Sequence, residues 1–424
     1  MKQSFFDLKI QEISNKKRGP WELMGWVHKH KLPAIEAVKY NSYLCLEIND
    51  LWFTLHLLFN MALDQCIEED ILDKVLSFIS SFWKAFFEKE FISSIARCNN
   101  SSTPGPDKLL WRHLKHIIKD KICLKNIINI ANMCIKLSHW PLHFKMSMTI
   151  VIPKLNKVSY NSPKLFRPIV LLNTIGKLIE KVISDRLQFY LISNNFIHQC
   201  QLGSLKFKAT SDADIALTHF ICMGWVKNLP SSILVFDISQ LFPSLNNCLL
   251  LHILGKACFD SKVIHFFSNY LIDIDRKTQY FWNNFSSPLF SVDVRVGQGS
   301  VLSPILSALY LAPVLHILEK HLKNLKIPIS MLSFVNNGLF IIQSKSFSFL
   351  NSLLFCSYNI TSILLWKFGL TLEHSKTKVF HFSRLHGTFN PSPLDFSVLG
   401  APILYSKEVW KYLGFIFDRK LTFC

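Results

Sequence analysis

The sequence predicts an α+β fold in which helices and short strands alternate irregularly. Residues 233–236 form a short, continuously apolar run, which is typical of a buried strand. "MLSFVNNGLF" (331–340) has two apolar runs separated by Asn-Gly, which predicts a hairpin. "NTIGKLIEKVISDRLQFYLI" (173–192) has apolar residues at helical spacing. Because the order of these elements does not repeat as strand–helix–strand units, α+β is favoured over α/β.

The first half of the chain is predicted to be mainly helical. Residues 71–87 carry apolar side chains at helical spacing, which predicts a helix facing a core. "SSTPGPDK" (101–108) is predicted as a loop because Pro-Gly-Pro cannot continue a helix or a strand. A helix is expected at 109–119. "MTIVIPKLNK" (148–157) predicts a strand that enters a basic loop.

The second half adds the strands and hairpins. The buried run at 233–236 ends at Asp237, and "FSVDVRVGQGS" (290–300) is a second strand-like stretch that ends in glycines. A long helix should begin near residue 302, before the predicted hairpin. After the hairpin we expect a helix at about 350–368 and a strand at "KVFHF" (378–382).

The composition indicates a folded protein with a polyanionic partner. The chain has 424 residues, enough for two or three domains, and is 50% hydrophobic and 18% charged. Its formal net charge of +18 suggests nucleic acid first and an anionic membrane surface second. A generally basic soluble protein remains an open alternative.

The cysteines and the apolar segments indicate an intracellular protein. Eleven scattered cysteines without a CxxC pair argue against a zinc finger and suit reduced thiols in the nucleus or cytoplasm. The first 20 residues have no continuous apolar core, so we expect no signal peptide and no secretion. The most apolar window, 301–318, is interrupted by prolines and a histidine, so we expect a buried helix and no membrane partner.

Asp237 is the first candidate for chemistry. It follows four apolar residues, and carboxylates are rarely buried without a partner or a metal. The tip of a neighbouring hairpin could supply further oxygen ligands for Mg²⁺, but here it carries the neutral amides Asn336 and Asn337. From these residues alone, a loop aspartate beside a plain Asn-Gly turn stays open.

Nine stretches, taken in order, resemble the reverse transcriptase domain of non-LTR (LINE-type) retrotransposons. They are "SSTPGPDKL" (101–109), "VIPKLNK" (151–157), "FRPIVLLNTIGKLIEKVISDRL" (166–187), "QLGS" with "TSDA" (201–204 and 210–213), "VFDISQLFPSLN" (235–246), "GQGSVLSPILSALYL" (297–311), "SFVNNGLF" (333–340), "HSKTKVFHF" (374–382) and "WKYLGFIFDRKLTF" (410–423). The resemblance implies a right-hand polymerase with fingers and a palm, whose antiparallel sheet packs on helices.

The resemblance also implies a division of the chain into four parts. Residues 1–94 are expected to be a helical extension, a remnant of a linker upstream of the polymerase. Residues 95–230 would form the fingers and the start of the palm, and residues 231–405 the palm. Residues 406–424 would begin a truncated thumb.

The resemblance implies catalytic roles at four positions. Asp237 matches the first metal-binding aspartate, and Asn336 and Asn337 stand where the family has an Asp-Asp pair. The metal would therefore be held by Asp237 and Asn336. Lys376 matches a lysine near the leaving pyrophosphate, although a solvated surface charge remains an alternative for it.

Five further positions match substrate-binding residues of the family. Phe242 matches the aromatic residue that crowds a ribose 2′-hydroxyl, with a plain core residue as the alternative. Gln298 and Gly299 match a loop that packs against the nucleotide and template. Arg167 and, more weakly, Lys154 match finger residues that meet the triphosphate, with an ordinary ion pair as the alternative for Arg167.

The implied function is an RNA-directed DNA polymerase, a nucleotidyltransferase of a transposable element. It would bind an RNA template, a DNA primer and dNTPs, and would use two Mg²⁺ ions. Because Asn336 and Asn337 replace the acids, we expect a degenerate active site and an inactive or weak enzyme. The alternatives are a non-enzymatic nucleic-acid-binding remnant of the same fold and, less favoured, a membrane-surface or structural protein.

Overall fold

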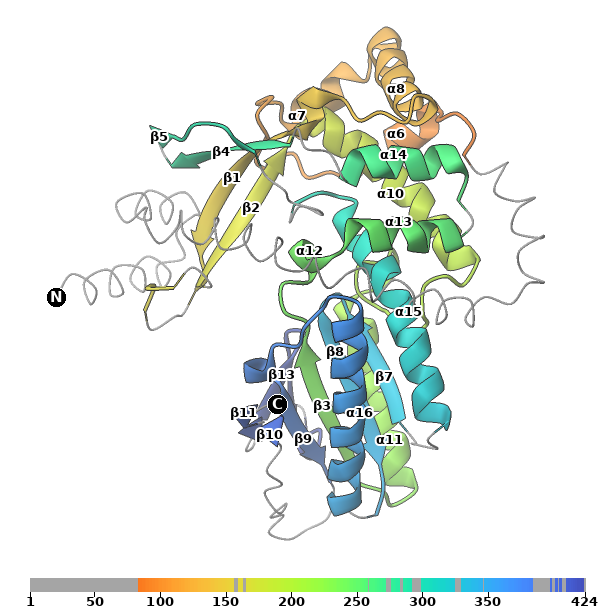
Figure 1. The fold of residues 1–424 in the computed structure, drawn as a ribbon, viewed down its shortest axis with the longest axis vertical. Helices are drawn as coiled ribbons and strands as arrows, with labels where there is room; N and C mark the ends of the chain where they lie inside the picture. The colour runs from red at the N-terminus through yellow and green to blue at the C-terminus, as the bar shows by residue number, and fades with distance from the viewer. Residues whose placement is uncertain are drawn as a thin grey trace, which may run out of the picture. The chain divides into compact units, whose positions relative to one another are not determined.

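The computed structural model describes residues 83–155, 159–162, 165–257, 259–271, 276–282, 285–291, 299–324, 329–345, 347–383, 397–398, 401–402, 404–405 and 409–422. Residues 71–82 of the helix predicted at 71–87 lie outside the described residues. Its last part is wrong, because residues 83–87 are not helical and the next helix begins at Glu88. Gln298 also lies outside the described residues. Within the described part, helices and strands alternate irregularly, which confirms the predicted α+β class (Figure 1).

The chain forms two compact units, and over the described residues it passes between them three times. Of the described residues, the first unit holds 83–187 and 247–303, and the second holds 188–246 and 304–422. The predicted domain boundaries after residues 94, 230 and 405 stay predictions.

The first unit combines helices with a small mixed sheet. Strand β1 (Met146–Pro153) pairs antiparallel with β2 (Phe166–Leu172) and parallel with β4 (Lys277–Trp282). Two short strands, β5 (Phe285–Ser286) and β6 (Phe290–Ser291), pair with β4. The helices are α6 (Glu88–Ala96), α7 (Trp111–Ile117), α8 (Lys121–Lys136), α9 (Leu142–Lys145), α10 (Thr174–Ser193), α13 (Asn247–Lys256) and α14 (Ser261–Leu271).

The loop predicted at 101–108 is confirmed, and it has a structural task at the start of α10. The Asp107 carboxylate accepts hydrogen bonds from the backbone N–H groups of Leu109, at 3.2 Å, and Thr174, at 2.6 Å. Thr174 is the first residue of α10, whose first N–H groups have no partner within the helix. The loop therefore supplies the N-terminal cap of a helix 67 residues further along the chain.

The second unit is built around a five-stranded sheet with the order β12-β9-β3-β8-β7. The central strand β3 (Ser231–Asp237) is antiparallel to both β8 (Asn337–Gln343) and β9 (Lys378–Phe382). The remaining elements are α11 (Thr210–Val226), α12 (Leu241–Ser244), α15 (Ser303–Asn324), β7 (Ile329–Phe334), α16 (Phe347–Lys367), the 3₁₀-helix η2 (His374–Lys376), β10 (Ser397–Val398), β11 (Ala401–Pro402), β12 (Leu404–Tyr405), β13 (Val409–Tyr412) and β14 (Phe415–Asp418).

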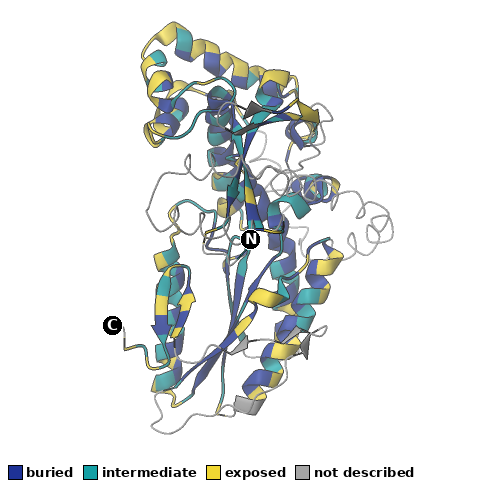
Figure 2. Ribbon diagram, turned by 90° about the vertical axis from the view of Figure 1, so that its left-hand side faces the viewer, coloured by how far each residue is buried: buried dark blue, intermediate teal, exposed yellow. Residues whose placement is uncertain are grey.

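Both faces of this sheet are covered, and buried residues run along its strands (Figure 2). On one face, side chains of α11, β3, β8 and β9 form a core with Trp410, Tyr412 and Phe417 of the β13–β14 hairpin. On the other face, α16 lies across β3 and β8 (Figure 1). Because successive side chains of a strand point to opposite faces, cover on both sides explains why four consecutive residues of the central strand, 233–236, are apolar.

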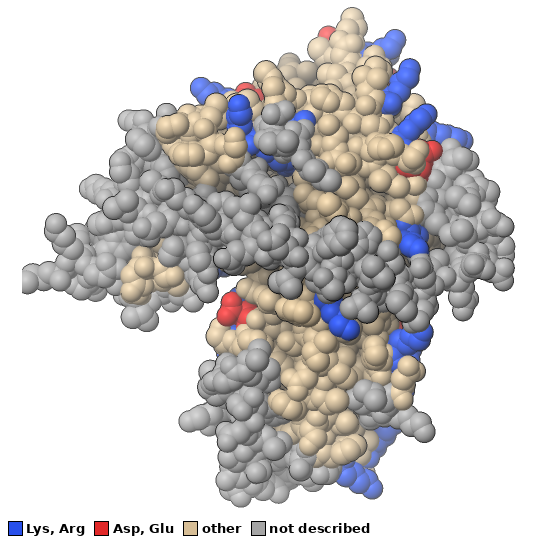
Figure 3. Space-filling model, viewed as in Figure 1, with Lys and Arg blue, Asp and Glu red and all other residues tan. Residues whose placement is uncertain are grey.

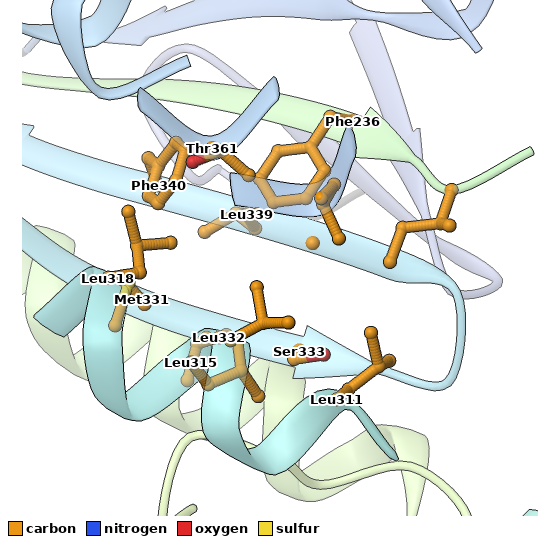
Figure 4. Close-up of a pocket in the computed structure, with 14 residues that line it drawn as sticks. Phe236, Leu311, Leu315, Leu318, Met331, Leu332, Ser333, Leu339, Phe340 and Thr361 are labelled. Carbon is orange, nitrogen blue, oxygen red and sulfur yellow. The ribbon is translucent and has the colours of Figure 1, made fainter. Parts of the chain in front are cut away.

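A small apolar cavity of about 20 Å³ lies between α15, α16 and the sheet. Figure 4 shows leucines of α15 and residues of β7 around it, with Phe236 and Phe340 on the opposite side. A cavity of this size holds one water at most, and an apolar lining keeps such a space dry. The cavity therefore gives no indication of a ligand site.

The predicted hairpin is present, but its turn lies two residues before the predicted Asn-Gly pair. Phe334 pairs with Asn337, so the turn is Val335–Asn336, and Asn337 already belongs to β8. Val335 has a φ of 58°, the conformation that a turn with a positive φ at its first central residue requires. Gly338 serves packing, because a Cβ atom there would lie 2.1 Å from the ring of Phe236.

Two described helices, Ser303–Asn324 and Phe349–Lys367, are long and apolar enough to cross a membrane by length and composition alone. Two thirds of the apolar window of Ser303–Asn324 is buried, and its leucines line the cavity beside the sheet. Core helices of globular proteins meet the same criterion. The absence of a membrane partner stays a prediction.

Candidate active site

Asp237 is the last residue of the central strand β3, and it is 5% exposed. Its register partner on β8 is Asn337. The backbone N–H of Ile238 donates to the carbonyl of Asn336 at 2.8 Å, which fixes the hairpin tip beside the strand end. The predicted proximity of Asp237 and the hairpin tip is confirmed.

Both carboxylate oxygens of Asp237 accept hydrogen bonds from side chains. The Asn336 amide donates through Nδ2 to Oδ1, and the Lys376 ammonium donates through Nζ to Oδ2. The Asn336 carbonyl oxygen turns away and accepts from the Asn337 amide at 3.4 Å. This amide orientation follows from electrostatics, because the reverse orientation would bring two acceptor oxygens together.

Lys376 reaches Asp237 because η2 is fastened to the sheet and to α16. The Glu373 N–H donates to the Asp237 carbonyl at 2.8 Å, just before η2 begins. The buried Tyr358 hydroxyl of α16 contacts His374 Nδ1 at 2.7 Å and Thr377 Oγ1 at 3.0 Å. The lysine side chain is 63% exposed, so its ammonium faces both the carboxylate and solvent. Sequence reasoning missed Tyr358, because its spacing on α16 is that of an ordinary core residue.

A segment outside the sheet also holds the hairpin. Leu202 N–H donates to the Ser333 carbonyl at 2.8 Å, and Ser333 N–H donates to the Cys200 carbonyl at 2.8 Å. These bonds pair the edge strand β7 with the "QLGS" stretch, so that its edge is not left open. The stretch was recognised in the sequence as a motif, but nothing in its local pattern indicated this contact.

Phe242 lies on α12, five residues after Asp237, and is half-buried. Gln240, directly before α12, has a φ of 45° and turns the chain there. The neighbouring Leu241 is 3% exposed and belongs to the core. The structure thus places Phe242 in the same unit as Asp237, and its sugar-sensing role stays a prediction.

The remaining candidate residues belong to the first unit. Arg167 is exposed on β2, opposite Ile152 of β1, and Lys154 follows the end of β1. Gly299 has a φ of 137°, and a Cβ atom there would lie 2.1 Å from the Val170 carbonyl oxygen of β2. Only glycine fits this approach. The triphosphate and template roles of these residues stay predictions.

Comparison with known protein families supports the same assignment. Residues 152–417 match the family model described as "Reverse transcriptase (RNA-dependent DNA polymerase)". The chain belongs to this family. The matched segment includes the Asp237 strand, the Asn336 hairpin and Lys376, and it confirms the predicted reverse transcriptase domain.

Two curated relatives are polymerases of Drosophila melanogaster transposons. The probable RNA-directed DNA polymerase from transposon BS is 25% identical over 53% of this chain and 24% of its own length. That from transposon X-element is 23% identical over 79% of this chain and 35% of its own length. The chain thus spans about a quarter to a third of these reverse transcriptases, and the predicted resemblance to the LINE-type domain is confirmed.

Among solved structures, apo telomerase from Candida tropicalis, truncated from its C-terminal domain, gives a TM-score of 0.43. It is 17% identical, over 66% of this chain and 54% of that one. Telomerase of the same organism in complex with a telomeric RNA fragment gives 0.39 at 16% identity, over 57% of this chain and 42% of that one.

Reverse transcriptases generally use divalent metal ions and a nucleic-acid template. The donor set beside Asp237 in this chain does not fit a two-ion site. Among the described residues, no group of three or more His, Cys, Asp or Glu side chains could hold a metal ion. Both Asp237 oxygens face donors, and the Asn336 oxygen points away from them. Mg²⁺ prefers near-ideal octahedral oxygen coordination with carboxylates, which this arrangement does not offer.

Proposed function

We propose that this chain is the fingers and palm part of a retrotransposon RNA-directed DNA polymerase with impaired nucleotidyl transfer. It would bind an RNA template, a DNA primer and dNTPs inside the cell. The observation that carries the proposal is the pairing of Asp237 with the neutral amide of Asn336, at the position where the resemblance implies an acid. One carboxylate and one amide oxygen would hold Mg²⁺ far more weakly than three carboxylates.

The charge of the chain supports a nucleic-acid partner. Its formal net charge is +18, and exposed lysines lie on α8 and α14 of the first unit, among them Lys121, Lys125 and Lys262. In the view of Figure 3, Lys and Arg side chains outnumber Asp and Glu side chains on the described surface. The names of the curated relatives also support a transposon-encoded polymerase.

A second function is a non-enzymatic nucleic-acid-binding remnant of the same fold. It is favoured by the hydrogen bonding of Asp237, because both carboxylate oxygens are already satisfied by side chains of the chain itself. In that case the basic surface and the fold would be retained, while the chemistry is lost.

The test combines binding and primer extension on one substrate, an RNA template annealed to a fluorescent DNA primer. We expect anisotropy to show binding that weakens steeply with salt, because phosphate contacts release counterions. Binding with slow extension supports the polymerase, and binding without any incorporation supports the remnant. No affinity for the substrate, together with flotation of the protein on anionic liposomes, would overturn both and favour a membrane-surface protein.

A further inference from the structure

The first unit contains a buried carboxylate to which the motifs assign no role. Glu180 lies on α10 and is 2% exposed. Its Oε1 accepts from the Tyr270 hydroxyl at 2.7 Å, and its Oε2 accepts from the Ser300 hydroxyl at 2.8 Å and from the Val301 N–H at 2.9 Å. A carboxylate is seldom buried so deeply without a specific reason.

The partners of Glu180 come from two other segments of the unit. Tyr270 lies on α14, and its hydroxyl also contacts the Ser300 hydroxyl at 2.8 Å. The Arg276 guanidinium lies over the Tyr270 ring, at 4.8 Å from its centre, and donates to the Tyr270 carbonyl. Burial raises the pKa of Glu180 above its usual value. The hydrogen bonds from Tyr270, Ser300 and Val301 and the charge of Arg276 offset part of this rise.

Ser300 and Val301 directly follow Gly299, which is pressed against β2. Because Glu180 holds the two residues after Gly299, it fixes where the chain leaves this contact. The Leu302 N–H donates to the Ser300 hydroxyl at 3.1 Å, so the network also includes the residue directly before α15. Glu180 is thus the only group among these that reaches both Ser300 and Val301 from a rigid helix.

We propose that Glu180 is a positioning residue for nucleotide binding, which acts by holding the Gly299–Val301 segment in place. That the ligand is a dNTP rests on the proposed polymerase function. That Glu180 holds the segment rests on the hydrogen bonds described above. Loss of the carboxylate would let the segment move away from β2 and weaken dNTP binding more than template–primer binding.

The chemistry of the network gives a matched pair of variants. In Glu180→Gln, the amide oxygen can accept from Ser300 and Val301, while the amide nitrogen donates to the Tyr270 hydroxyl, which then donates to Ser300. All hydrogen bonds can be kept. In Glu180→Leu, the size is similar, but the Val301 N–H loses its partner, and the Ser300 and Tyr270 hydroxyls lose the carboxylate that accepts from them.

A third variant controls for general loss of stability in the same unit. The Glu90 carboxylate accepts two hydrogen bonds from the Arg186 guanidinium, at 2.5 and 2.7 Å, and the two side chains form a half-buried ion pair. Glu90→Leu breaks that ion pair without touching Gly299, Ser300 or Val301.

The experiment uses the full chain and two readouts. Hydrogen exchange of the Val301 amide should become at least about tenfold faster in Glu180→Leu, and should stay within twofold of wild type in Glu180→Gln and Glu90→Leu. With template–primer bound, the Kd of a fluorescent dNTP should rise about tenfold in Glu180→Leu alone, while the Kd of template–primer changes less.

Unchanged Val301 exchange in Glu180→Leu would overturn the proposal. If the wild-type chain binds dNTP, two further results would overturn it. One is a dNTP affinity that is the same in wild type and in every variant, and the other is a loss of dNTP affinity in Glu90→Leu as large as that in Glu180→Leu. If the wild-type chain binds no dNTP, the proposed polymerase function fails, and the nucleotide half of this proposal falls with it. Selective acceleration at Val301 would then still establish the holding role.

Discussion

Placing two acids at the tip of the hairpin should make both stability and activity depend on magnesium. The variant is Asn336→Asp/Asn337→Asp. In wild type, the Asn336 amide donates to Asp237, so the contact is attractive. In the double variant a second carboxylate meets Asp237 at the same place, and two carboxylates cannot share this position without a cation or a proton between them.

The magnitude follows from the geometry. Two unit charges about 4 Å apart repel by about 4 kcal/mol at an effective dielectric of 20. The Lys376 ammonium on the other Asp237 oxygen offsets part of this. In EDTA the double variant should therefore lose about 2 kcal/mol of unfolding free energy relative to wild type. Mg²⁺ at about ten times its Kd should return about 1.4 kcal/mol through mass action.

The assay is urea unfolding in EDTA and in MgCl₂, followed by primer extension on the same preparations. We expect Mg²⁺ to stabilise the double variant selectively and to raise its extension rate at least about a hundredfold over wild type, since a few kcal/mol of barrier correspond to that factor. Asn337→Asp alone is the matched control. The Asn337 side chain hydrogen-bonds to Asn336, and Asn337 meets Asp237 only as its backbone partner in the sheet.

Two results would refute this reasoning. One is a wild-type chain that extends primers within a few-fold of the double variant. The other is equal stabilisation of both proteins by Mg²⁺, which would mean that the added carboxylates do not form a cation site beside Asp237.

Three further predictions concern the second unit. Gly338→Ala should cost about 1–3 kcal/mol, because its Cβ would overlap the Phe236 ring, and Phe236→Leu should recover part of this loss in chemical denaturation. Tyr358→Phe should cost about 1 kcal/mol by removing the contacts to His374 and Thr377, and an unchanged denaturation midpoint would contradict it. Burial, with the charge of Arg419, lowers the pKa of His381 to about 4 from 6.5, so the fold favours the neutral ring. The stability from His381 is full above pH 6.5 and is lost as the pH falls from 6.5 to 4, by up to about 1.4 kcal/mol per unit. His381→Gln should flatten this slope in unfolding measured across that range, and an unchanged slope would contradict the prediction.

Local pattern was sufficient to predict some of the main elements. The apolar run before Asp237 predicted β3, and helical spacing predicted α10 and α16, because burial imposes these periods on neighbouring residues. The order of motifs predicted the family, and the amides Asn336 and Asn337 could be read directly from the chain.

The turn of the hairpin was beyond such reasoning. Asn-Gly is the usual signal for a two-residue turn, yet the turn is Val335–Asn336. The register is set by the pairing of β8 with β3, and Gly338 is needed where the Phe236 ring leaves no room for a Cβ atom. Packing against a strand 100 residues earlier therefore outweighed the local preference.

The sequence by itself determined several main elements, among them β3, α10 and α16, the family, and the amides at positions 336 and 337, since each of these depends on neighbouring residues or on the order of motifs. Only the tertiary structure decided that Asn336 and Lys376 both donate to Asp237, and that Glu180 meets Ser300 and Val301. These partners are 99, 139 and about 120 residues apart. No local period links residues so distant, and they meet because buried polar groups must find hydrogen-bond partners when the sheet and helices pack.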